Sequence, residues 1–476
     1  MLLKELLPNI NGDMGNIEIA DLTCDSRKVQ KGFAFVCING FNSDGHNFAK
    51  AAVEAGAAVI IAERPTGEKP EIIVEDTHKA YAEMSANYFG NPSREFKLLG
   101  VTGTNGKTSV TYMLKAIIEA KGYKTGVIGT IQNLIGDKVV ESVNTTPDAY
   151  NLNALFAKMR DEGCKYVIME CSSHALDQKR IFNLDFEVAA FTNLTQDHLD
   201  YHITMENYLE AKKKLFSMCK NAVINIDDKY GKIIADEIGC NLLTYAVEDR
   251  NAIYSANGLK MRPDGIEYEM VSDYNIKRIK LRTGGKFSVY NSLCAAVCAK
   301  ALGFSEEDIA TALETLEGVK GRAEVVKTGK DFTVIIDYAH TPDGLYNILS
   351  TFKELKNGRL VCLFGCGGNR DATKRPIMGS IAAKMSDFVI VTSDNPRLED
   401  PTLIIKDILE GVKDTKTPCM VIENRIDAIK YAVQNAREGD IIVLAGKGHE
   451  TYQILNTGKI HLDEREVVAE ALLELQ

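Results

Sequence analysis

The stretch that decides the fold class is KLLGVTGTNGKTSVTYMLKAIIEA, residues 97–120. Its first six residues are mostly apolar, as in a buried strand, and a glycine-rich segment, TGTNGK (102–107), follows at once. Beyond it, apolar residues recur at helical spacing, namely Val110, Met113, Leu114, Ile117 and Ile118. A strand, a glycine-rich loop and a helix in this order predict an α/β fold that binds phosphate between the strand and the helix.

The glycine-rich loop has the residue types that phosphate binding requires. Glycines let backbone N–H groups approach phosphate oxygens, the helix N-terminus adds positive potential, and Lys107 can reach the outer phosphates. Thr108 has the position of a magnesium-ligating hydroxyl. The spacing departs from G-x-x-x-x-G-K-[ST], because Val101 stands at the first glycine position and Gly100 comes one residue early. This departure argues against a plain GTPase or motor protein.

The rest of the chain alternates between strands and helices in two blocks, which predicts two parallel sheets. The first block adds strands at YVIME (166–170), VAAFTN (188–193) and AVINID (222–227), then a β-rich stretch from about 250 to 285. Helices are expected at 291–303 and 305–316, the second opened by a capping box of Ser305 and Asp308. The second block has expected strands at 333–338, 360–365, 388–393, 419–424 and 441–446.

Residues before the first block are organised differently. They contain short strands, one of them AVIIAE (58–63), and one clear helix, NFAKAAVEAGA (47–57), and they end in a turn at Asn91-Pro92-Ser93. A chain of 476 residues is also too long for one ordinary core. We therefore expect three α/β domains, at 1–94, 95–320 and 321–476.

Composition excludes several classes of protein. A net charge of −10 gives no basic excess for coating a nucleic acid. The eleven cysteines include no C-x-x-C pair, which predicts free thiols in a reducing compartment. No segment approaches the roughly 18 apolar residues of a membrane span, and the N-terminus has no run typical of a signal peptide. We expect a cytoplasmic protein without a membrane span, and a monomer.

Polar residues follow two strands next to the phosphate loop. Glu170 closes one strand, and Asp197, His198, Asp200 and His202 follow the other. A carboxylate just past a neighbouring strand is well placed to hold the magnesium of a bound nucleotide. Lys212 lies further on in ENYLEAKKKLF (206–216), where three consecutive lysines indicate a solvated helix face.

The second block predicts a basic rim. Three polar loops, GCGGNRDATKR (365–375), SDNPR (393–397) and AGKGHE (445–450), follow three expected parallel strands. Their cations are Arg370, Lys374, Arg375, Arg397 and Lys447. Because arginine binds carboxylates through two parallel hydrogen bonds, an acidic ligand is expected here.

Taken in order, these segments resemble the Mur ligases over nearly the whole chain. The matching motifs are TGTNGKTS, NTTPD, ECSSHALDQKR, FTNLTQDHLDYHITMENYLEAK, YNSLCAA, GRAE, DYAHTPDGL, FGCGGNRDATKR, SDNPR and AGKGHE. The resemblance implies an α/β protein of three domains. A UDP-binding domain comes first, a central P-loop ATPase-like domain with a mostly parallel sheet second, and a Rossmann-like domain that takes the incoming amino acid last.

The resemblance also implies roles for individual residues. Those at the uridine-diphosphate site would be Cys24, Ser26, Phe41, Asn42 and Ser43. Those holding the muramoyl-peptide would be Asn144, Thr145, Thr146, Ser172, Gln178 and Arg180. The ATP contacts would be Gly103, Thr104, Asn105, Gly106, Lys107, Thr108 and Ser109 in the loop, with Asn291, Arg322, Asp337 and His340 near the hinge.

Metal binding and catalysis are implied in the same way. Glu170, His198 and Thr108 would bind magnesium, two ions in all. Lys212 takes the place of a lysine that reacts with carbon dioxide in the family, so the resemblance reverses the reading as a surface lysine and makes it a carbamate ligand. Lys107, Lys212, His198 and Glu170 would be the catalytic residues.

The activity implied is ATP-dependent peptide-bond formation. ATP would convert the D-Glu γ-carboxylate of UDP-MurNAc-L-Ala-D-Glu into an acyl phosphate, and the amine of meso-diaminopimelate would attack it. The D-N-P-R sequence marks members of the family that add diaminopimelate, because Arg397 offers a partner to its extra carboxylate. The corresponding pocket would comprise Arg370, Asp394, Asn395, Pro396, Arg397, Gly446 and Glu450.

Three alternatives remain open at this point. A lysine-adding sister enzyme would differ in the amino-acid pocket alone. A folylpolyglutamate synthetase shares the phosphate loop, but the SDNPR and GKGHE motifs argue against it. A nucleotide-binding protein without ligase activity would need no amino-acid rim, and an NKxD base-reading motif is absent from the sequence.

Overall fold

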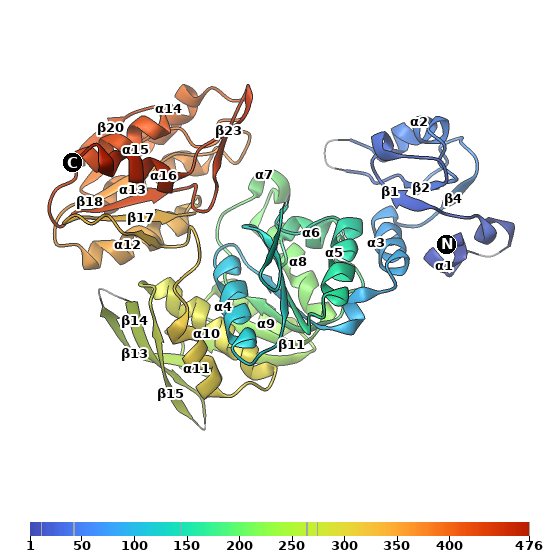
Figure 1. Ribbon diagram of the computed structural model, residues 1–476, viewed down its shortest axis with the longest axis horizontal. Helices are drawn as coiled ribbons and strands as arrows, with labels where there is room; N and C mark the ends of the chain where they lie inside the picture. Colours follow the sequence, from blue (N-terminus) through green and yellow to red (C-terminus); the bar gives the residue numbers. More distant parts are fainter. Residues whose placement is uncertain (11, 41–42, 143, 263–264, 274, 476) are drawn as a thin grey trace.

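The computed structural model describes the chain except residues 11, 41–42, 143, 263–264, 274 and 476. Phe41 and Asn42, predicted at the uridine-diphosphate site, therefore lie outside the described residues. Three α/β bodies follow one another along the chain, each built on its own sheet (Figure 1). The predicted fold class is confirmed. The division of the chain at residues 94 and 320 remains a prediction.

The N-terminal body has a four-stranded parallel sheet. Its strands pair in chain order and are β1 (Asp21–Thr23), β2 (Phe33–Val36), β3 (Val59–Ala62) and β4 (Glu71–Ile73). Its helices are α1 (Leu3–Leu6), α2 (Ala49–Glu54) and α3 (Thr77–Tyr88). One clear helix was predicted here, at 47–57, so α3 is an addition. Small or polar residues, among them Thr77, Ala80, Ala82 and Ser85, supply much of its buried side, which gives a weak apolar pattern.

The central body has an eleven-stranded sheet in the order β15-β14-β13-β12-β11-β10-β5-β9-β6-β7-β8. Its parallel part consists of β12 (Asn241–Ala246), β11 (Cys219–Asn225), β10 (Phe186–Phe191), β5 (Lys97–Thr102), β9 (Tyr166–Glu170) and β6 (Thr125–Ile128). β13 (Tyr254–Arg262) pairs parallel with β12 and antiparallel with β14 (Gly265–Val271), which pairs with β15 (Ile276–Leu281). The predicted β-rich stretch is thus confirmed. The hairpin of β7 (Asn133–Ile135) and β8 (Lys138–Val140) at the other edge was not expected.

Helices cover both faces of this central sheet. One face packs against α4 (Lys107–Glu119), α10 (Lys286–Ala301) and α11 (Glu306–Thr315). The other packs against α5 (Ala149–Asp161), α6 (Ser173–Asp177), α8 (Met205–Lys213) and α9 (Lys229–Glu237). Ser305 caps α11 as predicted, since its hydroxyl accepts a hydrogen bond from the Asp308 backbone N–H. Burying both faces fixes β5 at the centre of the sheet, and the phosphate loop with it.

The C-terminal body has a six-stranded sheet in the order β16-β17-β21-β18-β19-β20. Its strands are β16 (Glu324–Val326), β17 (Thr333–Asp337), β21 (Ile441–Ala445), β18 (Leu360–Phe364), β19 (Phe388–Val391) and β20 (Cys419–Val421), all parallel except β16. One face carries α12 (Pro342–Leu355), α13 (Lys374–Met385) and α14 (Pro401–Val412), and the other carries α15 (Arg425–Gln434) and α16 (Glu464–Leu473). β21, β18 and β19 are neighbours, so the loops that follow them form one rim, as predicted. A short hairpin, β22 (Tyr452–Leu455) and β23 (Gly458–His461), follows the last of these loops.

The cysteines and the helices of the structure bear on two of the predictions. All eleven cysteines have free thiols, which confirms the prediction. Within the described ranges, no helix combines the length and the apolar character needed to cross a membrane.

Candidate active site

The phosphate loop, residues 103–106, leads from β5 directly into α4. Gly103 and Gly106 have φ angles of 144° and 88°, which side-chain-bearing residues adopt at a cost. A Cβ on Gly106 would also lie 2.3 Å from Asn291 Oδ1, so glycine allows the loop to pack against α10. Lys107 Nζ donates to the carbonyl oxygens of Gly103 (2.9 Å) and Thr104 (2.8 Å). The lysine therefore lies over the loop where phosphate oxygens would be.

An oxygen-rich group lies beside the loop. Thr108 Oγ1 donates to Glu170 Oε1 at 2.9 Å and accepts from Arg322 Nη2 at 3.0 Å. Thr130, at the end of β6, donates its backbone N–H to Glu170 Oε1 (2.9 Å) and its hydroxyl to Oε2 (3.0 Å). Glu170 is buried at the end of β9. Magnesium prefers such oxygen donors, usually one or two carboxylates completed by substrate phosphates and water, and the Thr108–Glu170 pair fits this pattern.

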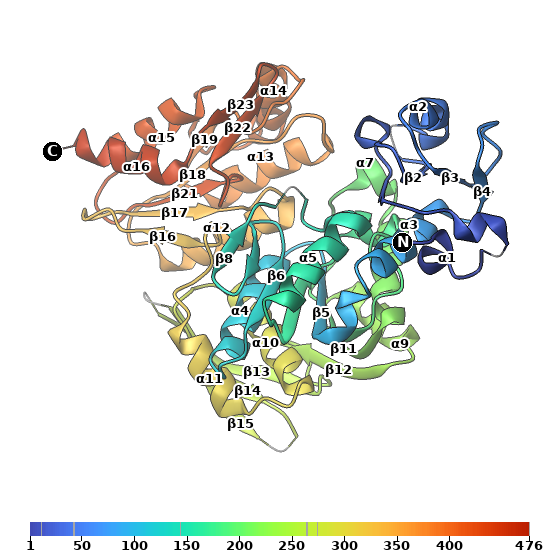
Figure 2. The same ribbon diagram turned by 45° about the vertical axis from the view of Figure 1, so that its right-hand side comes forward.

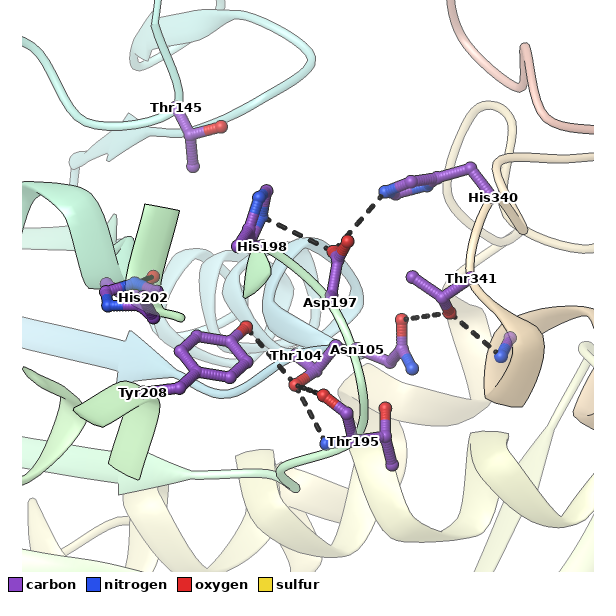
Figure 3. Close-up of polar contacts among 12 residues, drawn as sticks. Thr104, Asn105, Thr145, Thr195, Asp197, His198, His202, Tyr208, His340 and Thr341 are labelled. Atoms are coloured by element: carbon purple, nitrogen blue, oxygen red, sulfur yellow. Dashed lines mark hydrogen bonds and ion pairs between the residues drawn. The ribbon is translucent and has the colours of Figure 1, made fainter. Parts of the chain in front are cut away.

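Asp197 links the central body to the C-terminal body. Figure 3 shows it between His198 and His340, with Oδ2 at 3.3 Å and 3.9 Å from their Nε2 atoms. Lys374 Nζ lies 3.5 Å from Oδ1. Burial lowers the pKa of His198 to about 3 and that of His340 to about 4, so both rings are neutral near pH 7. A neutral imidazole is the form that can bind a metal.

These groups surround a cavity of about 510 Å³ between the central and C-terminal bodies. Of the residues predicted for ATP and metal, it is lined by Thr104, Asn105, Gly106, Lys107, Thr108, Ser109, Glu170, His198, Asn291, Arg322, Asp337 and His340. Its further lining residues include Thr130, Asn193, Tyr290 and Asp343, which the sequence analysis did not select. Within the part of the chain described, no three His, Cys, Asp or Glu side chains group closely enough to hold a metal ion.

Two of the unselected residues hold the loop. Asn193 Oδ1 accepts from the Asn105 backbone N–H at 2.9 Å, and Asp343 Oδ2 accepts from Asn105 Nδ2 at 2.9 Å. Thr341 also approaches Asn105, at 3.5 Å between side-chain oxygens, as drawn in Figure 3. Asn193 ends the VAAFTN stretch and Asp343 lies in the TPD motif, so their places at strand and helix ends were the available signal.

The burial of Lys212 differs from what the surrounding run of lysines predicted. The side chain is 1% exposed, and Nζ donates to the Gly103 carbonyl at 2.8 Å while lying 4.4 Å from the centre of the Tyr208 ring. Burial lowers the pKa of this amine far below its usual value, and the charge of Lys107 lowers it further. The reading of the lysine run as a solvated face was therefore wrong for Lys212. It holds for Lys214, which is exposed and paired with Asp177.

The residues predicted to hold the muramoyl-peptide mostly lie together beyond Glu170. Thr146 Oγ1 donates to the Glu170 carbonyl at 2.7 Å and accepts from the Ser172 backbone N–H at 3.0 Å. Arg180 reaches the Thr146 carbonyl (3.0 Å) through Nη1 and Gln178 Oε1 (3.0 Å) through Nε. Thr145 Oγ1 lies 3.0 Å from Thr130 Oγ1, and Asn144 precedes it. Thr145 and Ser172 line the 510 Å³ cavity, whereas Gln178 lines a separate pocket.

The described residues of the predicted uridine-diphosphate site lie in the N-terminal body, away from this cavity. Cys24 follows β1, Ser26 begins a short 3-10 helix, and Ser43 lies in the loop after β2. None of the three lines the 510 Å³ cavity. Burial raises the pKa of the Cys24 thiol, and Asp148 at the start of α5 adds to the increase. Cys24 thus faces the junction between the N-terminal and central bodies.

The seven residues predicted for the amino acid lie on the C-terminal rim. Asn395 Nδ2 donates to Glu450 Oε2 at 2.9 Å, and Lys447 Nζ donates to the same oxygen at 2.7 Å. Gly446 packs closely against Asp394. A larger residue would not fit at this position, because its Cβ would lie 2.7 Å from Asp394 Oδ2. Arg397 follows Pro396, has a φ of 56° and donates to the Gly368 carbonyl at 2.9 Å, while Arg370 lies across the same loop.

The predicted basic rim needs one correction. Arg375 is ion-paired with Glu399 (2.8 Å) and Asp407 (2.9 Å), and Lys447 with Glu450. Lys374 lies against Asp197. These three cations are therefore already partnered within the protein. In the described ranges, neither Arg370 nor Arg397 has a carboxylate within 4.0 Å, so these two guanidinium groups are the ones open to an anion.

The fold and the site define a class: an α/β protein of three bodies with a phosphate-binding type of loop at a cavity between the central and C-terminal bodies. The chain belongs to the Mur ligase family, as predicted. Models of the family match at residues 18–89 (Mur ligase family, catalytic domain), 101–299 (Mur ligase middle domain) and 321–448 (Mur ligase, glutamate ligase domain).

Individual relatives are similar over the full length. A UDP-N-acetylmuramoyl-L-alanyl-D-glutamate–2,6-diaminopimelate ligase of Caldanaerobacter subterraneus is 47% identical, covering 99% of this chain and 98% of its own. The protein of the same name from Clostridium botulinum is 48% identical over 96% of each chain. A solved structure of a ligase with this name has a TM-score of 0.71 at 31% identity, covering 100% of this chain and 99% of its own. A folylpolyglutamate synthase of Mycobacterium tuberculosis, at 16% identity and a TM-score of 0.63 over 83% of this chain and 94% of its own, shares the fold.

Proposed function

We propose that this chain is a cytoplasmic, monomeric, ATP-dependent ligase. It joins meso-diaminopimelate to the D-Glu γ-carboxylate of UDP-MurNAc-L-Ala-D-Glu in peptidoglycan synthesis. The observation that carries the choice of amino acid is the pair of guanidinium groups, Arg370 and Arg397, which face the rim without a carboxylate partner in the described part of the chain. The names of the full-length relatives agree with this choice.

The reaction requires activation of a carboxylate, which is a poor electrophile. The γ-phosphoryl group of ATP passes to the D-Glu γ-carboxylate, giving ADP and an acyl phosphate. The amine of the amino acid then attacks the carbonyl carbon, and the tetrahedral adduct expels phosphate and loses a proton. In this chain, the backbone of residues 103–109 and Lys107 would hold the phosphates, with Asn291, Arg322, Asp337 and His340 completing the nucleotide site.

Magnesium would be held by the oxygen donors beside the loop. Thr108 and Glu170 are hydrogen-bonded to each other, and the neutral His198 ring lines the same cavity. When bound, the metal supplies positive charge that offsets the phosphate oxygens. Lys107, Glu170, His198 and Lys212 are thus proposed as the catalytic residues.

Carbamylation of Lys212 fits its surroundings. The reaction of a neutral amine with carbon dioxide forms an N–C bond and releases one proton, and burial of Lys212 favours that neutral amine. The product would be an anion close to Lys107 and to the Gly103 carbonyl end of the loop. It would therefore add a carboxylate-like ligand where the metal is expected.

The two other substrates would bind on either side of the nucleotide cavity. The muramoyl-peptide would lie along Asn144, Thr145, Thr146, Ser172, Gln178 and Arg180, with its nucleotide at Cys24, Ser26 and residues 41–43. The amino acid would lie on the rim, with its far carboxylate at Arg397 and Arg370 and its far ammonium group at Glu450. Asp394, Asn395, Pro396 and Gly446 would shape this pocket.

A ligation assay tests the proposal. The protein, ATP, Mg²⁺ and UDP-MurNAc-L-Ala-D-Glu are combined with meso-diaminopimelate, L-lysine or L-ornithine at matched concentrations. We expect diaminopimelate to be ligated far better than the other two, because a site built around a charged group rejects ligands that lack it. Efficient ligation of lysine with little diaminopimelate would overturn the amino-acid assignment alone, and absence of any ligation would overturn the ligase.

The Arg397→Ala variant sharpens this assay. Loss of a buried charge partner costs on the order of 2–5 kcal/mol, so diaminopimelate use should fall by roughly 30-fold or more. Arg397→Lys should recover part of it, since it keeps the charge but not the two-pronged contact. Arg437→Ala, an exposed arginine of the same body near the opposite end of β21, is the matched control and should retain full activity.

A further inference from the structure

We propose that Arg425 and Glu464 are positioning residues for the incoming amino acid. Their buried ion pair holds Asp394 next to the rim with one carboxylate oxygen left free for an ammonium group of that amino acid. The inference rests on the proposed function, because it concerns the same amino-acid site. Neither residue belongs to a rim loop, and each acts through residues that do.

Arg425 ties three elements together beneath the rim. It is the first residue of α15 and is 1% exposed. Its Nε donates to Glu464 Oε1 at 2.9 Å, and its Nη2 donates to the Ala445 carbonyl at 2.8 Å. Glu464 begins α16 and is 0% exposed. The guanidinium group therefore fixes the end of β21, immediately before Gly446, relative to both helices on that face of the sheet.

One carboxylate oxygen of Asp394 has no hydrogen bond in the described part of the chain. Its Oδ1 accepts from the Asn395 backbone N–H at 2.7 Å, but Oδ2 has no hydrogen bond in the described part of the chain. Arg425 Nη1 lies 3.9 Å from this oxygen and is also without a hydrogen bond there. A buried carboxylate oxygen left unpaired costs free energy, so its retention calls for a ligand. Gly446 adds no side chain to cover this oxygen, since a Cβ there would lie 2.7 Å from Oδ2.

Glu464 accounts for the distance that remains between the guanidinium group of Arg425 and the carboxylate of Asp394. Burial raises the pKa of the Glu464 carboxyl, and Arg425 is the strongest influence in the opposite direction. Arg425 thus directs Nε toward Glu464 rather than forming a two-pronged contact with Asp394. If Glu464 lost its charge, the 3.9 Å gap would close and Asp394 Oδ2 would be taken up by Arg425.

The charges of the buried cluster agree with a cationic guest. Its carboxylates are Asp394, Glu450 and Glu464, and its cations are Arg425 and Lys447. With all five ionised, one negative charge is in excess. The far ammonium group of the amino acid, bound at Glu450 and also by Asp394 Oδ2, would balance it, while Arg397 and Arg370 nearby take the carboxylate of the same zwitterion.

A purely structural ion pair would behave differently from a positioning pair. Replacing both members of a buried pair by apolar residues of similar size is often neutral for stability, whereas removing one member is costly. A structural pair should therefore be dispensable for activity in a stable double variant. A positioning pair should not, and its loss should raise the KM for the amino acid without changing the KM for ATP.

The experiment uses the full-length enzyme and two variants, Glu464→Gln and the double variant Arg425→Met/Glu464→Leu. Wild type is first shown to ligate meso-diaminopimelate. We expect both variants to raise the KM for diaminopimelate by about tenfold or more, with kcat and the KM values for ATP and the nucleotide-peptide within about twofold. Glu464→Gln keeps an oxygen for Arg425 and therefore provides a folded variant if the double one fails to fold.

The control is Arg359→Met, which breaks the Arg359–Asp440 ion pair (2.6 Å) at the opposite end of the same strands. It should lower stability and leave the KM for diaminopimelate unchanged. A folded Glu464→Gln or double variant with an unchanged KM for diaminopimelate overturns the inference while the proposed function stands. A wild-type enzyme that ligates no amino acid overturns both.

Discussion

At the scale of single residues, Ile203 carries the clearest local strain. It lies between α7 (Leu199–His202) and α8 with a φ of 69°, and its side chain is 77% exposed. A β-branched residue at positive φ costs about 1–3 kcal/mol, and little packing compensates for it here. We expect Ile203→Gly to raise the free energy of unfolding by about 1 kcal/mol, after the larger chain entropy of glycine is subtracted.

Urea unfolding monitored on the central body measures this change. Ile233→Gly is the matched control, because Ile233 is also exposed (40%) but lies inside helix α9. That substitution should destabilise by about 1 kcal/mol, as glycine does in a helix interior. Equal effects of both substitutions would show that the backbone at Ile203 is not strained.

Lys212 gives the second prediction at this scale. If the carbamate is needed, Lys212→Ala should lose nearly all ligase activity, and formate or another small carboxylate should restore part of it by filling the vacated space. Lys214→Ala, two residues on and exposed, should remain active. A Lys212→Ala variant with near-normal turnover, or an unmodified lysine in a crystal of the magnesium- and substrate-bound enzyme near neutral pH, would contradict the proposal.

The site residues differ in how far the sequence could predict them. The loop residues around Lys107 follow from local chemistry, because glycines and a lysine at a strand–helix junction have few other uses. Burial of Lys212 does not follow, since its local pattern matches an exposed lysine run and a long-range contact with Gly103 overrides it. Arg425 and Glu464 are 39 residues apart in sequence, and no local pattern marks them as partners.

At the scale of elements, helix α3 connects the N-terminal body to the residues proposed to hold the muramoyl-peptide. Asp76 caps α3 by accepting from the Lys79 backbone N–H at 3.0 Å, and it also pairs with Lys179 of the central body. Lys179 has a φ of 53° and stands between Gln178 and Arg180. The carboxylate of Asp76 therefore both caps α3 and contacts the segment 178–180 that is proposed to bind the nucleotide-peptide.

Two substitutions separate these roles. Asp76→Asn keeps a capping side chain and removes the ion pair, so we expect a higher KM for the nucleotide-peptide with little change in stability. Asp76→Ala should lose about 1 kcal/mol more, from the missing cap. Kinetics with varied nucleotide-peptide and with varied ATP, together with urea unfolding, provide both readouts. An unchanged KM for the nucleotide-peptide in Asp76→Asn would show that Lys179 does not position the segment.

This element also shows which parts of the fold the sequence could predict. The long apolar strands and helix α4 follow directly from their periodicity. Helix α3 was missed because its buried side chains include Ala80, Ala82 and Ser85, which give little contrast with the exposed ones. The β7–β8 hairpin was missed because its strands have three residues each and gain stability from the neighbouring β6 rather than from their own pattern.

At the scale of the whole molecule, the cavity proposed for the nucleotide is lined by residues of two bodies, the central and C-terminal bodies, which Figure 2 shows next to each other. The phosphate loop lies in the central body, and the first turn of α12 lies in the C-terminal body, joined to it through Asn105 and Asp343. Gln196 reaches Thr373 at 3.1 Å across the same boundary. A ligand in this cavity therefore contacts both bodies, while the N-terminal sheet lies outside it.

Hydrogen exchange tests this coupling. A non-hydrolysable ATP analogue with Mg²⁺, at 100 times its Kd, should stabilise the folded site by about 2.7 kcal/mol. Amides that exchange only when the site opens should therefore exchange roughly 100-fold more slowly. We expect protection in residues 103–109 and in the first turn of α12 together, and none in α2. In Lys107→Ala, both regions should lose protection at that analogue concentration, because one ligand serves both. Protection confined to the loop would mean that the C-terminal body does not contribute to nucleotide binding, and that closure of the two bodies waits for the amino acid.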